Sequence, residues 1–177
     1  MKRHVALVGF MAAGKSTIGK RLARKLKCAF YDVDDLVVKE HGAISDIFYN
    51  EGEASFRRYE KAALAQVFEN GDSGIVALGG GALTNDDNQK LLKKRAYRVF
   101  VKVSPEQALE RMRRSKVVRP LLGPTPSLSK IRELYVKRMP QYAHADFVIE
   151  VDDLSTSQVV DGIIEWLHKK KIEINKR

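Results

Sequence analysis

The chain contains a single cysteine, Cys28, among its 177 residues. One cysteine cannot form an intramolecular disulfide or supply a thiolate cluster for a metal, so the sequence excludes both devices. No histidine or carboxylate pattern near Cys28 would activate the thiol. We therefore expect Cys28 to be a small apolar residue on the core side.

Long apolar runs are also lacking. No stretch approaches the roughly 20 apolar residues that a membrane-spanning helix needs. The chain passes from Met1-Lys2-Arg3 directly into a short apolar segment, without the pattern of a signal peptide. We expect a cytoplasmic protein with no membrane partner.

Acidic residues are too few to balance the basic ones: 22 Asp and Glu stand against 32 Lys and Arg, a formal net charge of +10. Such an excess implies an anionic partner, which could be nucleic acid, a membrane surface, a nucleotide or a carboxylate substrate. The basic residues are dispersed across the predicted helices, and the sequence shows no aromatic-basic strand platform of the RNA-binding kind. This pattern favours small anionic ligands over nucleic acid.

Short apolar segments alternate with helical patterns along the chain. The predicted strands are residues 4–8, 29–33, 75–78, 97–103 and 146–151. The predicted helices are residues 15–27, 36–39, 45–49, 53–69 and 86–94, with others beginning near residues 104, 131 and 155. The alternation predicts one α/β domain over residues 1–177, a three-layer sandwich around a five-stranded parallel sheet. Ligands of such folds bind beyond the carboxyl ends of the strands.

A glycine-containing loop follows the first predicted strand. Residues 9–17 read GFMAAGKST and match the P-loop pattern GxxxxGK[ST] at every fixed position, with a strand before and a helix after. Backbone N–H groups of such a loop and the helix N-terminus bind phosphate; Lys15 would reach the β- and γ-phosphates and Ser16 would ligate Mg²⁺. The predicted nucleotide contacts in the loop are Ala12, Ala13, Gly14, Lys15, Ser16 and Thr17.

Two motifs of other P-loop proteins are missing. The sequence has no Asn-Lys-x-Asp motif, which argues against a GTPase switch. The predicted strand 75–78 ends in glycines and not in Asp-Glu, which argues against a motor ATPase. Phosphate transfer from the nucleotide to a small acceptor is the remaining prediction.

Two aspartates close the second predicted strand. Asp32 and Asp34 flank Val33, and alternation in an extended segment would direct both carboxylates to the same side. One carboxylate could then serve the metal and the other the acceptor. A solvated acidic loop is the alternative interpretation.

Six pieces of sequence, in order over roughly residues 4–167, together resemble the shikimate kinase family. They are Gly9 to Thr17, Asp32-Val33-Asp34, Gly52-Glu53 with Phe56-Arg57 and Glu60, Gly79-Gly80-Gly81, Arg119-Pro120-Leu121-Leu122, and Arg138 with Pro140 and Tyr142. The resemblance implies a P-loop NTPase fold of the nucleoside-monophosphate-kinase type. It also implies transfer of the ATP γ-phosphate to the 3-hydroxyl of shikimate in aromatic amino acid biosynthesis, with Mg²⁺ as cofactor, by a monomer.

The resemblance assigns roles to residues of the acceptor site, whose helices would span about residues 33–61. Arg57 and Arg138 match the clamp for the shikimate carboxylate, since a guanidinium pairs with both carboxylate oxygens. Asp34 matches the carboxylate that holds the acceptor hydroxyls and could take the proton of the 3-hydroxyl. Gly79, Gly80 and Gly81 would bring bare backbone to the substrate, with Gly80 in direct contact. Asp32 would hold waters of the Mg²⁺ ion.

Further implied roles concern arginines outside this pocket. Residues 115–127 resemble the family's lid, on which Arg119 would bring positive charge to the β- and γ-phosphates. Arg111 is a candidate for stacking on adenine, with a solvated basic face as the alternative. Glu60 could orient the Arg57 guanidinium or could form an ordinary surface pair with it.

Two other functions stay open. A related P-loop kinase for another small polyol acid, such as gluconate, would also need a carboxylate clamp, although the Asp-x-Asp, Phe-Arg and Gly-Gly-Gly set favours shikimate. A basic nucleic-acid-binding P-loop protein is the alternative from a different class, and a gel shift at moderate salt would distinguish it.

Overall fold

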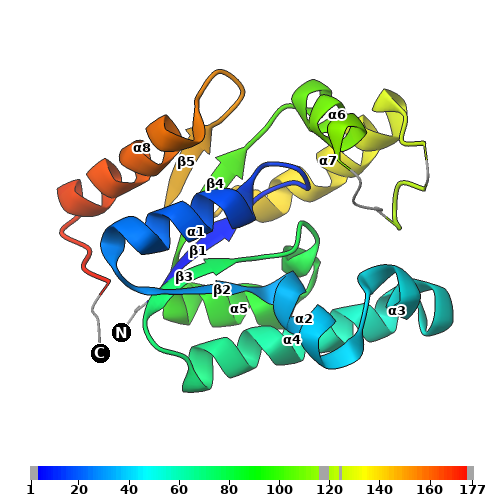
Figure 1. Cartoon of the computed structure of the whole chain (residues 1–177), viewed down its shortest axis with the longest axis horizontal. Helices are drawn as coiled ribbons and strands as arrows, with labels where there is room; N and C mark the ends of the chain where they lie inside the picture. Colours follow the sequence, from blue (N-terminus) through cyan, green and yellow to red (C-terminus); the bar gives the residue numbers. More distant parts are fainter. Residues whose placement is uncertain (1–3, 116–119, 124, 175–177) are drawn as a thin grey trace.

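The structure is a computed structural model that describes residues 4–115, 120–123 and 125–174 (Figure 1). Its strands are β1 (His4–Val8), β2 (Ala29–Asp32), β3 (Gly74–Ala77), β4 (Ala96–Lys102) and β5 (Phe147–Glu150). They form one sheet in the order β2-β3-β1-β4-β5, in which every neighbouring pair is parallel. The predicted five-stranded parallel sheet is confirmed.

The helices occupy the connections between the strands. They are α1 (Lys15–Leu26), α2 (Val33–His41), α3 (Ile44–Asn50), α4 (Gly52–Asn70), the short 3-10 helix η1 (Ala82–Thr84), α5 (Asp86–Arg95), α6 (Pro105–Arg114), α7 (Leu128–Tyr142) and α8 (Thr156–Lys169). The largest departures from the predicted bounds are at α2, which begins directly after β2, and at α7, which begins at Leu128 and not near residue 131. Helix α7 extends to Tyr142 although Pro140 lies inside it.

Helices cover both faces of the sheet and enclose one apolar cluster on each side. Strand β1 shows the division, because Val5 and Leu7 pack into one cluster while Ala6 and Val8 pack into the other. The first cluster includes side chains of α1, α6 and α8, and the second includes side chains of α2 to α5. A strand buried on both faces reads as a continuous apolar run, and the predicted three-layer sandwich is confirmed.

The parallel strands place their carboxyl ends at one edge of the sheet, where three of them continue into loops or helices of the candidate site (Figure 1). Strand β1 leads into the P-loop, β2 into α2, and β3 into Gly79–Gly81, which we call the glycine turn. Helix α7 contributes to both apolar clusters, through Ile131 near its start and Tyr142 at its end. No helix within the described residues is long and apolar enough to span a membrane.

Candidate active site

The P-loop has the backbone conformation that its glycines predict. Gly9 and Gly14 have φ values of 147° and 90°, in the region that favours glycine, and a β-carbon on Gly9 would collide with the carbonyl oxygen of Val101. Ala12 has φ of 60° without being glycine. Gly14 caps α1 and offers no side-chain acceptor, so the first-turn N–H groups can serve a phosphate.

Lys15 lies at the start of α1 with only 8% of its surface exposed. Its ammonium group donates hydrogen bonds to the carbonyl oxygens of Gly9 and Phe10, both at 2.8 Å. These are neutral acceptors on the loop itself, so the ammonium is held at the place where the P-loop would surround a phosphate.

A cavity of about 280 Å³ lies on the P-loop, and we call it the P-loop cavity. Its lining includes most of the predicted nucleotide and metal residues: Ala12, Gly14, Lys15, Ser16, Thr17, Asp32 and Arg111. Ala13 is not among the lining residues, because its side chain is buried in the core. A contact from Ala13 to a nucleotide would therefore have to come from its backbone.

The alternation argument for Asp32 and Asp34 is wrong. Asp32 ends β2 and caps α2, since its Oδ1 accepts hydrogen bonds from the N–H groups of Asp34 at 3.1 Å and Asp35 at 3.4 Å. Asp34 therefore belongs to the first turn of a helix and not to the strand. Both aspartates still line the P-loop cavity, because the chain turns inward where β2 passes into α2.

The residues beside the P-loop fit a divalent cation in chemistry. The Ser16 hydroxyl and the Asp32 carboxylate line one cavity and are oxygen donors, the type that Mg²⁺ prefers. Asp32 keeps one oxygen occupied by the α2 amides. Its other oxygen is the one that could accept from a metal-bound water.

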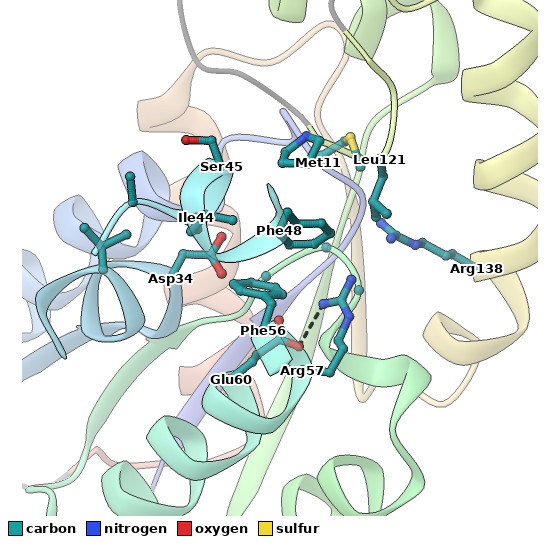
Figure 2. A pocket seen from close by; sticks show the side chains of 16 residues that line it. Met11, Asp34, Ile44, Ser45, Phe48, Phe56, Arg57, Glu60, Leu121 and Arg138 are labelled. Atoms are coloured by element: carbon teal, nitrogen blue, oxygen red, sulfur yellow. Dashed lines mark hydrogen bonds and ion pairs between the residues drawn. The ribbon is translucent and has the colours of Figure 1, made fainter. Parts of the chain in front are cut away.

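A second cavity, of about 370 Å³, adjoins the first and shares Met11, Asp34, Gly79 and Gly80 with it. We call it the second cavity. Its apolar wall comes mainly from α2, α3 and α4 and includes Val38, Ile44, Phe48 and Phe56. Figure 2 shows its polar groups entering from three directions: Asp34 from α2, Arg57 with Glu60 from α4, and Arg138 from α7.

Each glycine of the glycine turn lies directly against the backbone or charged groups of the site. A β-carbon on Gly79 would stand 2.5 Å from Glu60 Oε1 and 2.8 Å from Asp34 Oδ1. One on Gly80 would stand 3.1 Å from the Met11 amide nitrogen and 3.3 Å from Arg138 Nη1, and one on Gly81 would collide with the Arg57 guanidinium. The three glycines therefore allow the acidic and basic groups of the second cavity to close around the backbone.

Arg57 is held in place by two carboxylates. Its Nη1 donates to Glu60 Oε2 at 2.8 Å, and its Nε and Nη2 donate to Glu53 Oε1 at 3.2 and 3.1 Å. Burial disfavours the charged guanidinium, but Glu60 and Glu53 outweigh this effect and raise the pKa of Arg57. Arg58 is exposed and contacts Ser55 and the Tyr59 ring, so of the two adjacent arginines the structure places Arg57 in the cavity.

The surface-pair interpretation of Glu60 is wrong, because Glu60 is only 1% exposed. Burial raises the pKa of Glu60, and the neighbouring charge of Asp34 acts in the same direction, while Arg57 opposes both. Glu60 Oε1 has no hydrogen-bond partner among the described residues. Glu60 therefore orients Arg57 through one oxygen and keeps the other at the cavity.

Arg138 is the second guanidinium of this cavity and is 4% exposed. It lies over the Phe10 ring, 5.8 Å from the centroid, and its Nη1 has no hydrogen-bond partner among the described residues. Burial lowers the pKa of Arg138. A buried guanidinium with an unsatisfied N–H at a cavity indicates a place for an anionic group.

The structure describes the contacts of Arg111 but does not describe Arg119. The Arg111 guanidinium donates to the carbonyl oxygens of Ala12 and Ala13 at 3.4 Å and of Val151 at 3.1 Å, which joins the P-loop to the end of β5. Its stacking on adenine stays a prediction. Arg119 and part of the predicted lid, residues 116–119 and 124, lie outside the described residues. The described lid residues Pro120 and Leu121 line the second cavity.

The sequence analysis assigned no role to two residues that line the cavities or contact their walls. Met11 lines both cavities, inside a loop where the P-loop pattern leaves its position free. Tyr142 donates a hydrogen bond from its hydroxyl to the Gly80 carbonyl oxygen at 2.7 Å. The sequence could have indicated Tyr142 through its spacing of four residues from Arg138, because that spacing places the two side chains on one side of a helix.

The fold and the two joined cavities define a P-loop phosphotransferase whose acceptor is a small acid. Known proteins give the particular family. The shikimate kinase family model matches residues 11–168. The chain therefore belongs to the shikimate kinase family, and it is an enzyme of the kinase class.

Individual relatives agree along nearly the whole chain. The shikimate kinase of Caldanaerobacter subterraneus subsp. tengcongensis is 36% identical over 170 residues, which are 96% of this chain and 98% of the relative. A shikimate kinase of Thermus thermophilus is 40% identical over 167 residues, 93% of this chain and 90% of the relative. The solved structure of shikimate kinase from Acinetobacter baumannii in complex with shikimate has a TM-score of 0.90 and 33% identity, covering 97% of this chain and 96% of that one.

Proposed function

We propose that this chain transfers the γ-phosphate of ATP to the 3-hydroxyl of shikimate, giving shikimate 3-phosphate and ADP, in aromatic amino acid biosynthesis. The observation that carries the proposal is the second cavity, in which the buried Arg138 guanidinium, the partly buried Arg57 guanidinium and Asp34 surround the glycine turn beside the P-loop. Shikimate has one carboxylate for the guanidiniums and three hydroxyls, of which one must face the nucleotide. The relative from Acinetobacter baumannii was solved with shikimate.

The acceptor would bind with its carboxylate between Arg57 and Arg138. Glu53 and Glu60 already fix Arg57, so little side-chain entropy remains to be lost when the carboxylate binds. Asp34 lines both cavities and would hold the hydroxyl that reacts. The apolar wall with Phe48 and Phe56 would cover the ring of the substrate.

In the reaction, the 3-hydroxyl oxygen forms a bond to the γ-phosphorus and the bond from that phosphorus to the β-phosphate oxygen breaks. The proton of the hydroxyl passes to Asp34. Lys15, and Arg119 from the lid, would stabilise the charge that shifts onto the phosphate oxygens, because phosphoryl transfer depends on positioning and electrostatics more than on covalent help. Closure of the predicted lid, residues 115–127, would exclude water from ATP. Two of its described residues, Pro120 and Leu121, line the second cavity, which supports a position of the lid beside the acceptor.

Mg²⁺ is the cofactor that the site fits. Ser16 would ligate it directly and Asp32 would hold its waters, as the lining of the P-loop cavity allows. When bound, the ion neutralises charge on the β- and γ-phosphates. The single-domain organisation, the monomeric state, the cytoplasmic location and the absence of a nucleic-acid partner stay predictions.

A coupled assay of ADP release tests the proposal. The enzyme is supplied with ATP, Mg²⁺ and either shikimate, gluconate or buffer alone. We expect rapid release with shikimate and only background release with the other two. Equal rates in all three reactions would contradict the proposed acceptor, and faster release with gluconate would replace it.

Lys15→Ala provides the control for the nucleotide half of the site. We expect near-complete loss of turnover, because the variant lacks the cation that the P-loop holds beside the phosphates. Circular dichroism should show that the variant is folded. A fully active Lys15→Ala enzyme would refute the assignment of the P-loop cavity to ATP.

A further inference from the structure

Tyr142, the last residue of α7, contacts the glycine turn of the second cavity although its side chain does not line that cavity. Its side chain is 2% exposed, and its ring stacks on Phe100 of β4 with a centroid distance of 4.8 Å and an interplanar angle of 23°. Its hydroxyl donates to the Gly80 carbonyl oxygen at 2.7 Å. The ring is therefore fixed by packing, and the hydroxyl is fixed with it.

The hydroxyl keeps its proton across the physiological range. Burial raises the pKa of Tyr142 to about 12, and the nearby positive charge of Arg138 opposes this increase only in part. A neutral phenol stays a hydrogen-bond donor. The Gly80 carbonyl therefore has a permanent donor on one side of the glycine turn.

The peptide bond that Tyr142 holds joins two glycines, Gly80 and Gly81. Neither residue has a β-carbon that would limit rotation of this peptide, so its orientation has to be set from outside. The described chain contains no cis peptide, and in a trans peptide the C=O and N–H groups point in opposite directions. Fixing the Gly80 carbonyl on Tyr142 therefore directs the Gly81 N–H away from Tyr142, in a segment that lines the second cavity.

Arg138 stands one helical turn before Tyr142 on α7. A β-carbon on Gly80 would be 3.3 Å from Arg138 Nη1, so this guanidinium rests on the same glycine that Tyr142 holds. The hydroxyl, the Gly80 peptide and the Arg138 guanidinium thus form one contiguous set. A change in the peptide orientation would alter the surface against which Arg138 lies.

We infer that Tyr142 is a positioning residue of the acceptor site. Its hydroxyl orients the Gly80–Gly81 peptide, and this peptide in turn orients the Gly81 N–H group and the Arg138 guanidinium toward the bound acid. The inference rests on the proposed function for the identity of the acceptor. Tyr142 itself is not among the lining residues of either cavity. Its contribution should therefore appear in the binding of the acceptor and not in the binding of ATP.

Tyr142→Phe is the test, because it removes the hydroxyl and keeps the ring on Phe100. We expect the KM for shikimate to rise about 10-fold, the range for loss of a hydrogen bond that orders a binding site, while the KM for ATP changes less than about twofold. Tyr97→Phe is the matched control. Tyr97 is half-buried in the other apolar cluster, where its ring lies 6.4 Å from Trp166, and both KM values should stay at the wild-type level.

Each result decides between distinct explanations. A Tyr142→Phe enzyme with a lower unfolding temperature and unchanged KM for shikimate would mean a purely structural tyrosine and would overturn the inference. Equal increases in both KM values would also overturn it, because they would indicate a general distortion. A wild-type enzyme that does not phosphorylate shikimate would refute the proposed function, and the inference for that acceptor would fall with it.

Discussion

The burial of Glu60 separates the Arg57–Glu60 pair from the other ion pairs among the described residues. Glu60 is 1% exposed, whereas both partners of a pair such as Lys137–Glu133 are exposed by more than 60%. Exposed pairs contribute about 0 to 1 kcal/mol, but removing one partner of a buried pair leaves the other without compensation for lost solvation. Arg57 therefore supports the local structure and also presents its charge to the second cavity.

Arg57→Ala should raise the KM for shikimate far more than the KM for ATP. The substitution removes one guanidinium of the carboxylate clamp, and we expect an increase of roughly 100-fold for shikimate, the range for loss of a buried charged partner. Steady-state kinetics with each substrate varied in turn measures the two constants. The variant should also lose about 1 to 3 kcal/mol of stability, because Glu60 stays buried without its donor.

Arg58→Ala is the control for this prediction, since Arg58 is exposed on the same helix and contacts Ser55 and the Tyr59 ring. It should leave both KM values within about twofold of wild type, as expected for a surface substitution. Similar increases in both KM values for Arg57→Ala would refute its role at the carboxylate.

The resemblance identifies Arg57 from the sequence, because Phe56-Arg57 is part of one of the six pieces that carry it. The burial of Glu60 could not be predicted in the same way. It arises because α2 and the glycine turn pack against α4 and bring Asp34 and Gly79 beside Glu60. Contacts of this kind join residues that are distant in sequence, so no local pattern reports them.

At the scale of helices and strands, capping residues explain why the starts of helices such as α6 and α8 can be predicted from the sequence. Ser104 and Ser155 begin α6 and α8 by accepting hydrogen bonds from the N–H groups of Gln107 and Gln158, each three residues on. The same chemistry explains the error at Asp32 and Asp34, since the alternation argument extends the strand past Asp32, whereas Asp32 caps α2. An aspartate fits both the end of a strand and the start of a helix, and only the packing of α2 selects the second.

Ser155→Ala should lower stability without changing activity. Ser155 forms a reciprocal capping box with Gln158, so the substitution removes the acceptor for the Gln158 N–H and should cost about 1 kcal/mol. For a chain of this size the unfolding temperature should fall by roughly 2 to 4 °C. Thermal denaturation followed by circular dichroism measures the shift.

Ser157→Ala on the same helix is the matched control, because Ser157 is exposed and is not the cap of α8. It should leave the unfolding temperature unchanged. A Ser155→Ala variant as stable as wild type would show that α8 is held by its packing against the sheet alone.

At the scale of the whole molecule, the basic residues fall into two groups: those that line the two cavities and those that lie far from them. Four basic residues line the two cavities, where ATP and the acid would place their negative groups: Lys15, Arg57, Arg111 and Arg138. Most of the excess that gives a net charge of +10 lies elsewhere, as for the exposed Lys169 and Lys170 near the end of α8. These distant charges can act only through a long-range field, which salt screens over about 10 Å at 0.1 M.

Raising the salt concentration should therefore weaken the capture of both anionic substrates while leaving the chemical step alone. Between about 0.03 M and 0.3 M sodium chloride we expect the KM values for ATP and shikimate to rise roughly 3- to 10-fold, with kcat at saturation nearly constant, because screening acts on the approach of charge and less on buried contacts. The double variant Lys169→Gln/Lys170→Gln lacks two distant positive charges. Its KM values for ATP and shikimate should differ slightly from wild type at low salt and not at all at high salt. Retardation of a DNA duplex in a gel shift at moderate salt would instead assign the excess positive charge to a nucleic-acid surface. KM values that do not change with salt would show that the excess charge has no part in attracting the substrates.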